Sequence, residues 1–211
     1  MKQIRPAGQL NMAVLASGRG SNFDAICEAI ERHELDAGIK LLLSDKPAAP
    51  ALEKAKNRGI IAQAVEPHNF INRSAYENEL VRLMKEQQVD MVVLAGYMRL
   101  VGAVILDNYP NRVLNIHPAL LPAFPGLNAQ KQALDYGVKY SGCTVHIVDT
   151  GMDSGPIIRQ AVVPVLDNDD EETLSRRILE QEHRIYWQSL QLFAEGRVYL
   201  DGRRIVIKTD V

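Results

Sequence analysis

An almost wholly apolar segment, Asp90-Met-Val-Val-Leu-Ala95, most constrains what this chain can fold into. A strand with one wet face alternates apolar and polar residues, whereas a strand in the middle of a parallel sheet is apolar on both faces. The segment therefore predicts a central strand of a parallel sheet that is covered by helices on both sides.

The sequence around this segment supplies the other elements of such a sheet. Earlier strands are predicted at 11–16, 39–44 and 60–65, and earlier helices at 23–30, 48–58 and from Ser74 onward. Ser74-Ala-Tyr-Glu77 has the spacing of a capping box, which would make Ser74 the N-cap of its helix. A short helix to Asp107 and a strand at 112–116 follow the central strand. Alternating strands and helices predict a doubly wound, Rossmann-like α/β fold.

The C-terminal part departs from this alternation. Two β-rich runs, 143–148 and 157–163, are joined by a glycine-rich turn at 149–156, which fits an antiparallel pair better than a crossover. The sheet is therefore predicted to be mixed, although mostly parallel. The remaining elements are predicted as a helix at 128–136, a long helix from the acidic cluster 169–173 to about Ala194, and a hairpin at 198–207.

Composition limits the partners of the chain. Its 211 residues, 46% of them hydrophobic, can bury one core as a single domain. Lys and Arg number 24 against 26 Asp and Glu, which leaves no electrostatic footprint for nucleic acid or an anionic membrane. We see neither an apolar run of membrane-spanning length nor a secretory signal, and the two cysteines have no disulfide spacing. We therefore expect reduced thiols in a cytoplasmic protein.

The most suggestive polar pair is Asn115 with His117, at the end of a predicted strand. Residues two apart on an extended backbone point to the same side, so an amide and an imidazole are aimed at one place. Pro118, Pro122 and Pro125 follow, and they prevent the segment from continuing as a central strand or helix. Ligands gather at the carboxyl ends of strands in such sheets, so the pair indicates a site. The alternative is an Asn that satisfies loop backbone and a His packed beside proline.

Ser17-Gly-Arg-Gly-Ser-Asn22 joins the first main strand to its helix. Glycines permit a tight turn, and free N–H groups at a helix start favour an anion such as phosphate. The alternative is a plain glycine turn with Ser21 or Asn22 as N-cap. The segment matches neither the P-loop nor the GxGxxG spacing, which disfavours dinucleotide binding.

Three further acidic residues have two interpretations each. Asp149 and Asp153 are either turn formers or a source of a carboxylate that faces His117 and raises its pKa. Glu182 lies in register with the apolar stripe of the long helix, so it is either paired with something polar or exposed at the flank of the stripe. The other histidines have no companions at metal-ligand spacing and are predicted to be structural or at the surface: His33, His68, His146 and His183.

Four segments together are specific to one family. Ser17–Asn22, Leu94–Arg99, Leu114–Pro122 and Met152–Pro156 occur in the order and spacing of the phosphoribosylglycinamide formyltransferases, folate-dependent enzymes of purine synthesis, which the chain resembles over about 11–204. The resemblance implies the formyltransferase fold and transfer of a formyl group from 10-formyltetrahydrofolate to the amine of glycinamide ribonucleotide, without a metal.

The resemblance also implies roles for individual residues. Asn115, His117 and Asp153 would be catalytic, with Asn115 and a protonated His117 stabilising the formyl oxygen and Asp153 favouring the imidazolium. Gly20, Ser21 and Asn22 would hold the substrate phosphate, and Glu182 would meet the ribose. The residues that would border the folate are Arg73, Met98, Arg99, Leu100, Val101, Asn115, Asp149 and Asp153.

These roles divide the single domain into an N-terminal extension (1–10), a phosphate-binding half (11–110) and a catalytic and folate-binding half (111–211). We expect small-molecule substrates, no nucleic acid or membrane partner, and a monomer or weak homodimer. Two other functions stay open: a formyltetrahydrofolate hydrolase, which passes the formyl group to water, and a non-catalytic nucleotide-binding module, which would leave Asn115, His117 and Asp153 without a task.

Overall fold

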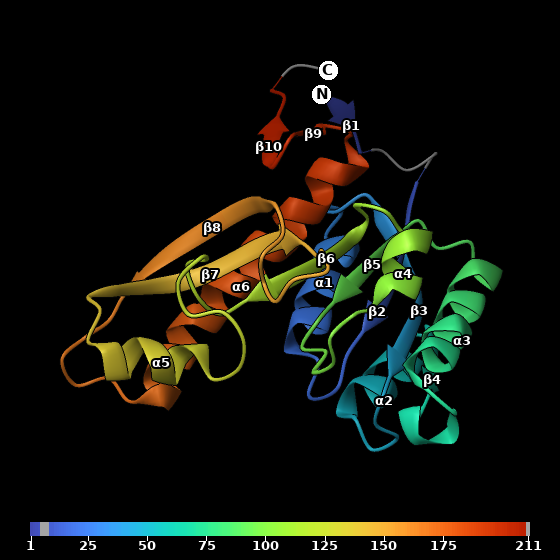
Figure 1. Ribbon diagram of the computed structural model, residues 1–211, viewed down its shortest axis with the longest axis horizontal. Coiled ribbons are helices and arrows are strands. Elements are labelled where there is room, and N and C mark those ends of the chain that lie inside the picture. Colours follow the sequence, from blue (N-terminus) through green and yellow to red (C-terminus); the bar gives the residue numbers. More distant parts are fainter. Residues whose placement is uncertain (5–8, 210–211) are drawn as a thin grey trace.

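The computed structural model describes residues 1–4 and 9–209, so positions 5–8 of the expected N-terminal extension and the last two positions lie outside the described residues. Seven strands form the main sheet, in the order β4-β3-β2-β5-β6-β7-β8 (Figure 1). Their bounds are β2 (Leu10–Leu15), β3 (Ala37–Ser44), β4 (Ile61–Ala64), β5 (Met91–Leu94), β6 (Val113–His117), β7 (Tyr140–Ile147) and β8 (Ile157–Pro164). Pairing is parallel from β4 to β6 and antiparallel at β6–β7 and β7–β8. The predicted mixed, mostly parallel sheet is confirmed.

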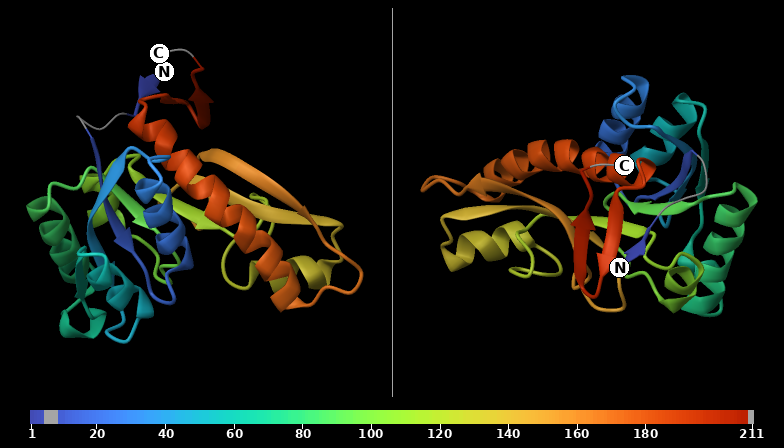
Figure 2. Two further views of the ribbon diagram at one scale, coloured as in Figure 1. Left: turned by 180° about the vertical axis from the view of Figure 1, so that it is seen from behind. Right: turned by 90° about the horizontal axis from the view of Figure 1, so that it is seen from above.

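Helices cover both faces of the sheet (Figure 2). Their bounds are α1 (Ser21–Glu31), α2 (Pro50–Asn57), the 3-10 turn η1 (Pro67–Asn69), α3 (Arg73–Glu86), α4 (Ala103–Asn108), α5 (Ala129–Tyr136) and α6 (Glu171–Ala194). One core lies between the sheet and α1, α2 and α6, and a second lies between the sheet and α3 and α4. Along the central strand β5, Met91 and Val93 enter the first core and Val92 enters the second. The apolar segment therefore serves both faces, as its composition predicts.

Two helix starts illustrate local capping. Asp170 caps α6 in a capping box with Thr173, in line with the predicted acidic start. The predicted Ser74 cap is wrong, because α3 begins at Arg73 and the side chain of Asn72 accepts the cap bond from the Ala75 N–H (2.9 Å). Asn72 offers a cap oxygen earlier in the chain, and Glu77 is left free for another partner.

A small second sheet stands apart from the main one, with strand order β1-β9-β10 (Figure 1). The predicted hairpin is confirmed as β9 (Val198–Asp201) and β10 (Arg204–Ile207), and β1 (Lys2–Gln3) adds a strand that the sequence did not indicate. Within the described part of the chain, none of the helices combines the length and apolar character needed to cross a membrane.

The strand order of the main sheet indicates where a ligand site should lie. From β2 the chain winds to β3 and β4 on one side, and it later returns to β5 and β6 on the other side. The carboxyl ends of β2 and β5 thus form the crevice of a topological switch point, where ligands bind in open α/β sheets.

Candidate active site

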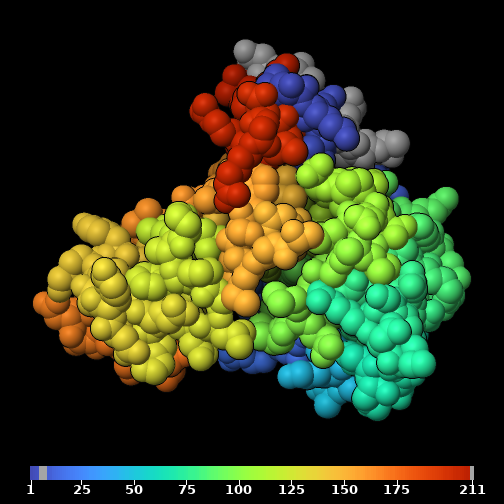
Figure 3. Space-filling view, in the orientation of Figure 1, coloured from blue at the N-terminus to red at the C-terminus, as the bar shows by residue number. Residues whose placement is uncertain are grey.

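A cavity of about 780 Å³ opens beside this crevice, at the carboxyl ends of β5 and β6, and its volume is within the range of small-molecule sites. It is hollowed between the loop that follows β5 and the loop that joins β7 to β8 (Figure 3). Several residues singled out from the sequence line it together: Arg73, Met98, Arg99, Leu100, Val101, Asn115, His117, Asp149 and Asp153. Gly20, Ser21, Asn22 and Glu182 do not line this cavity.

Asn115 and His117 lie at the end of β6 and both face the cavity, as expected for residues two apart on a strand. Asp153 joins them from the β7–β8 loop. Its Oδ2 lies 3.3 Å from His117 Nδ1, and its Oδ1 accepts a long hydrogen bond from Asn115 Nδ2 (3.5 Å). Of the two carboxylates that the sequence offered, Asp149 and Asp153, it is Asp153 that faces His117.

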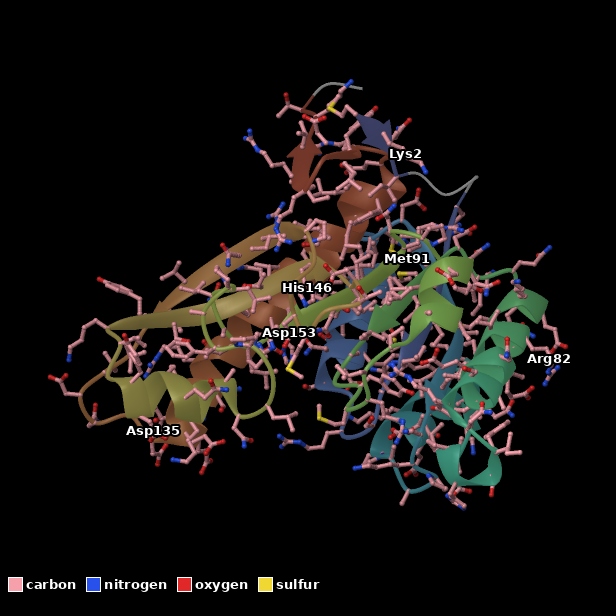
Figure 4. All side chains as sticks on the ribbon, viewed as in Figure 1. Lys2, Arg82, Met91, Asp135, His146 and Asp153 are labelled. Carbon is pink, nitrogen blue, oxygen red and sulfur yellow. The ribbon has the colours of Figure 1, made fainter. Side chains whose placement is uncertain are left out.

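His146 belongs to the same cluster, which excludes the surface part of its prediction as a structural or surface residue. The ring is buried, with Nε2 3.3 Å from Asn115 Nδ2 and 3.6 Å from Asp153 Oδ1 (Figure 4). The cause is the antiparallel register, which sets His146 on β7 directly opposite Asn115 on β6. The sequence predicted pairing of β7 only with β8, so neither the pairing of β7 with β6 nor its register was available to place His146 beside Asn115.

Burial and charge act in opposite directions on the cluster. Burial lowers the pKa of His117 below its ordinary value of 6.5, although the Phe124 carbonyl and Asp153 both raise it. Asp153 thus favours the imidazolium as expected, while desolvation is the larger influence and sets the direction of the net pKa shift, which the sequence left open. Burial alone would raise the pKa of Asp153, yet hydrogen bonds from His146 and the Gly126 N–H, together with the charge of His117, hold it below the usual range. Asp153 is consequently ionised at neutral pH.

Asp149 and Asp153 both lie on the β7–β8 loop, but their carboxylates have different partners. Asp149 Oδ1 accepts from the Gly151 N–H (3.0 Å) and the Ser154 hydroxyl (2.7 Å), so Asp149 is a turn former. Asp153 Oδ2 instead accepts from the Gly126 N–H (2.8 Å) on the proline-rich loop. This bond ties together the two loops that enclose His117.

Hydrogen bonds hold the proline-rich loop in place. His117 Nε2 lies 2.8 Å from the Phe124 carbonyl. The buried Thr144 hydroxyl on β7 donates to the Ala119 carbonyl (2.7 Å) and accepts from the Leu121 N–H (3.0 Å). Since prolines remove donors from this segment, side chains of the neighbouring strand supply the bonds that fix its path.

A second polar centre lies at the N-terminus of α1. The N-cap is Gly20, with φ 71° and no side-chain cap, so the alternative with Ser21 or Asn22 as N-cap is wrong. The first N–H groups of α1 are thus left open to an anion. Asn22 Nδ2 donates to the buried Glu182 Oε2 (2.8 Å), which excludes the exposed-flank interpretation of Glu182. Burial raises the pKa of Glu182, and this bond opposes the rise.

Hydrogen bonds near the topological switch point connect the start of α1 with the cavity. The Ser17 N–H donates to the Gly96 carbonyl (3.0 Å), and the Ser17 hydroxyl accepts from the Met98 N–H (2.9 Å). The loop after β2 is thereby bonded to the loop that lines the cavity. Among residues 1–4 and 9–209, no three His, Cys, Asp or Glu side chains gather as a metal site would require.

The chain is similar in sequence and in structure to known proteins. The family described as Formyl transferase matches residues 10–190. The phosphoribosylglycinamide formyltransferase of Bacillus subtilis (strain 168) is 45% identical over 174 residues, covering 82% of this chain and 89% of that protein. A crystal structure of glycinamide ribonucleotide transformylase 1 from Symbiobacterium toebii is 48% identical with a TM-score of 0.93, covering 94% of each chain. A formyltetrahydrofolate deformylase from Pseudomonas syringae is 28% identical with a TM-score of 0.88, and the match covers 95% of this chain and 66% of that one.

Proposed function

The chain belongs to the formyl transferase family, and from that premise we propose that it transfers the formyl group of 10-formyltetrahydrofolate to the amine of N1-(5-phospho-D-ribosyl)glycinamide. The products are the N-formyl compound and tetrahydrofolate, in de novo purine (IMP) biosynthesis. The family resemblance and the formyltransferase fold inferred from the sequence are both confirmed. The observation that carries the proposal is the meeting of Asn115, His117 and Asp153 in one cavity.

The chemistry needs a place where negative charge can develop. The substrate amine attacks the formyl carbon, a new C–N bond forms, and the formyl oxygen becomes an oxyanion. Asn115 Nδ2 is a donor that can stabilise that oxygen, and the His117 ring at the same strand end becomes a second donor once it has taken up a proton.

A proton then has to move from the attacking nitrogen to the folate nitrogen as the old C–N bond breaks. With its lowered pKa, His117 is largely neutral at pH 7 and can accept that proton. Asp153, ionised beside Nδ1, then stabilises the imidazolium until the proton passes to the leaving nitrogen. We place the substrate contact at Nε2, which must exchange its bond to Phe124 for one to the substrate, because Nδ1 keeps Asp153.

The glycinamide ribonucleotide is proposed to bind beside this cavity, at the start of α1. The uncapped N–H groups at Ser21 and Asn22 suit the phosphate, with Gly20 allowing the close approach. Glu182 suits a ribose hydroxyl, and the buried Asn22 Oδ1 has no partner within the described residues, so it can accept from a second hydroxyl.

The formyl donor is proposed to fill the cavity itself. Its rim carries large apolar side chains that are more than half exposed, which a planar aromatic ring system would cover: Met98, Leu100, Leu127 and Met152. The further residues proposed to border it are Arg73, Arg99, Val101, Asn115, Asp149 and Asp153.

The alternative activity is formyltetrahydrofolate hydrolysis, and the match to the deformylase keeps it in the test. The open start of α1 and the Asn22–Glu182 pair favour transfer, since hydrolysis gives them no ligand. We also propose that the protein is cytoplasmic and acts as a monomer or weak homodimer on small molecules alone.

One assay separates these functions. The protein is incubated with 10-formyltetrahydrofolate, with and without glycinamide ribonucleotide, and release of tetrahydrofolate and formation of the N-formyl product are followed. Release that requires the acceptor supports the proposal. Release at the same rate without it identifies a hydrolase, and no release in either case indicates a binding module.

A further inference from the structure

Glu77 is a buried carboxylate that the proposed mechanism does not use. It lies on α3 with 3% of its surface exposed, and acidic residues are almost never so buried unless they are paired. It accepts from Arg73 Nε (2.8 Å) and from the Gly102 N–H (2.7 Å), both at Oε1. Its partners therefore include the backbone of the loop that follows β5.

The close approach of this carboxylate explains the glycine at 102. A Cβ added to Gly102 would lie 2.7 Å from each carboxylate oxygen of Glu77, although the backbone angles of Gly102 suit any residue. Such a distance is below normal contact, so position 102 is restricted by Glu77 and not by backbone conformation. The packing leaves the Gly102 N–H directly against the carboxylate.

Arg73 extends the contact to a second point on the same loop. While Nε donates to Glu77, Nη2 donates to the Leu100 carbonyl (2.6 Å). Glu77 thus holds Gly102 directly and Leu100 through Arg73. Leu100, Val101 and Gly102 all line the cavity, so these bonds fix one wall of it.

We propose that Glu77 is a positioning residue that presets the 100–102 wall of the cavity for the formyl donor. The inference rests on the proposed function for the identity of that donor. Hydrogen bonds to a charged group are stronger than neutral ones, so a neutral residue at position 77 loosens both anchor points. The catalytic cluster and the start of α1 make no hydrogen bond to Glu77 within the described residues, so the effect is confined to binding of the donor.

The test is Glu77→Gln in the full chain, which keeps the size of the side chain and removes its charge. We expect the KM for 10-formyltetrahydrofolate to rise roughly tenfold. We expect kcat and the KM for glycinamide ribonucleotide to stay within about twofold of wild type, a split that general destabilisation would not produce. Glu79→Gln is the matched control, because Glu79 is on the same helix but pairs with Arg82 on its outer side (Figure 4).

A second variant and a second readout keep the inference separable from the proposed function. Gly102→Ala should raise the same KM, and its combination with Glu77→Gln should be less than additive, since both disturb one contact. Without any substrate, hydrogen exchange at the Gly102 amide should be faster in Glu77→Gln than in wild type.

Provided that the wild-type protein is active, two results would overturn the inference. One is an equal rise of the KM for 10-formyltetrahydrofolate and the KM for glycinamide ribonucleotide in Glu77→Gln, and the other is an unchanged KM for 10-formyltetrahydrofolate. Unchanged exchange at Gly102 would do so as well. If the wild-type protein transfers no formyl group, the proposed function fails, while the exchange experiment still decides whether Glu77 holds the loop.

Discussion

His117 has an oxygen acceptor beside each ring nitrogen, the Phe124 carbonyl and the Asp153 carboxylate. Two acceptors favour a doubly protonated ring, but burial lowers the pKa below 6.5. The unfolded chain therefore takes up a proton near pH 6.5 that the folded protein takes up only at lower pH. It follows that the free energy of unfolding contributed by His117 falls as the pH drops from about 6.5 to the folded pKa, and is constant above that window.

Replacement of Asp153 tests this balance. Asp153→Asn removes one of the two influences that raise the pKa of His117, so the pKa should fall further below 6.5. The ring resonances of His117 can be followed by NMR over a pH titration. Glu66→Gln is the control, because it removes a carboxylate that lies outside the site, beside the exposed His68 (3.7 Å), and should leave the pKa of His117 unchanged. A higher pKa for His117 in Asp153→Asn would contradict the assigned balance.

Asn115 and His117 are the two residues whose loss should affect turnover most. Asn115→Ala and His117→Ala should each reduce kcat by about 10²–10³, the usual cost of losing one oxyanion donor. Circular dichroism should show an unchanged fold, and His68→Ala should keep full activity. Wild-type kcat in both site variants would remove the pair from the chemistry.

Among the elements, β6 and β7 show what could be predicted from the sequence and what could not. The composition of the 112–116 segment and the prolines after it predicted a strand that ends at a site, and β6 ends there. The sequence could not supply the register of β6 against β7, because many registers satisfy two apolar strands, and so His146 was missed.

The sequence also could not decide between two possible N-caps of one helix, or predict the path of the proline-rich segment. Ser74 and Asn72 are both good N-caps; α3 uses Asn72, and Glu77, which a capping box would pair with Ser74, binds the Gly102 N–H on the loop after β5 instead. Prolines predicted an irregular segment after His117 but not its path, because that path is set by Thr144 on the neighbouring strand β7, which comes much later in the sequence. Long-range contacts, which sequence spacing does not record, decide each of these cases.

Thr144 on β7 anchors the proline-rich loop through its hydroxyl. Thr144→Val keeps the shape but removes a buried hydroxyl that bonds the Ala119 carbonyl, the Leu121 N–H and Gln160 Nε2 (3.0 Å). Unpaired buried groups cost about 1–3 kcal/mol, so the free energy of unfolding should fall by about that amount. Urea denaturation measures it, with the exposed Thr209→Val as control. Equal stability of the two variants would show that the hydroxyl does not anchor the loop.

The small sheet joins both ends of the described chain, and its hairpin reaches the site. β1 and the β9–β10 hairpin form this sheet outside residues 10–190, the range that matches the family. Arg203, in the hairpin turn, donates from Nη2 to the Ser154 carbonyl. Ser154 follows Asp153, so the hairpin reaches the loop that carries the proposed catalytic carboxylate.

Because Asp153 lies between the hairpin contact and the Gly126 contact, loss of either anchor should loosen its position beside His117. Arg203→Ala should lower kcat about two- to fivefold, a small effect because the guanidinium is exposed to solvent and its bond is correspondingly weak. The KM for glycinamide ribonucleotide should not change, since that substrate is proposed to bind at the start of α1. Steady-state kinetics with Arg204→Ala as control, an exposed neighbour with no hydrogen bond to this loop within the described residues, measures the difference. If the two variants lose the same activity, the hairpin acts only through the charge of the surface, and the contact with Ser154 has no part in setting Asp153.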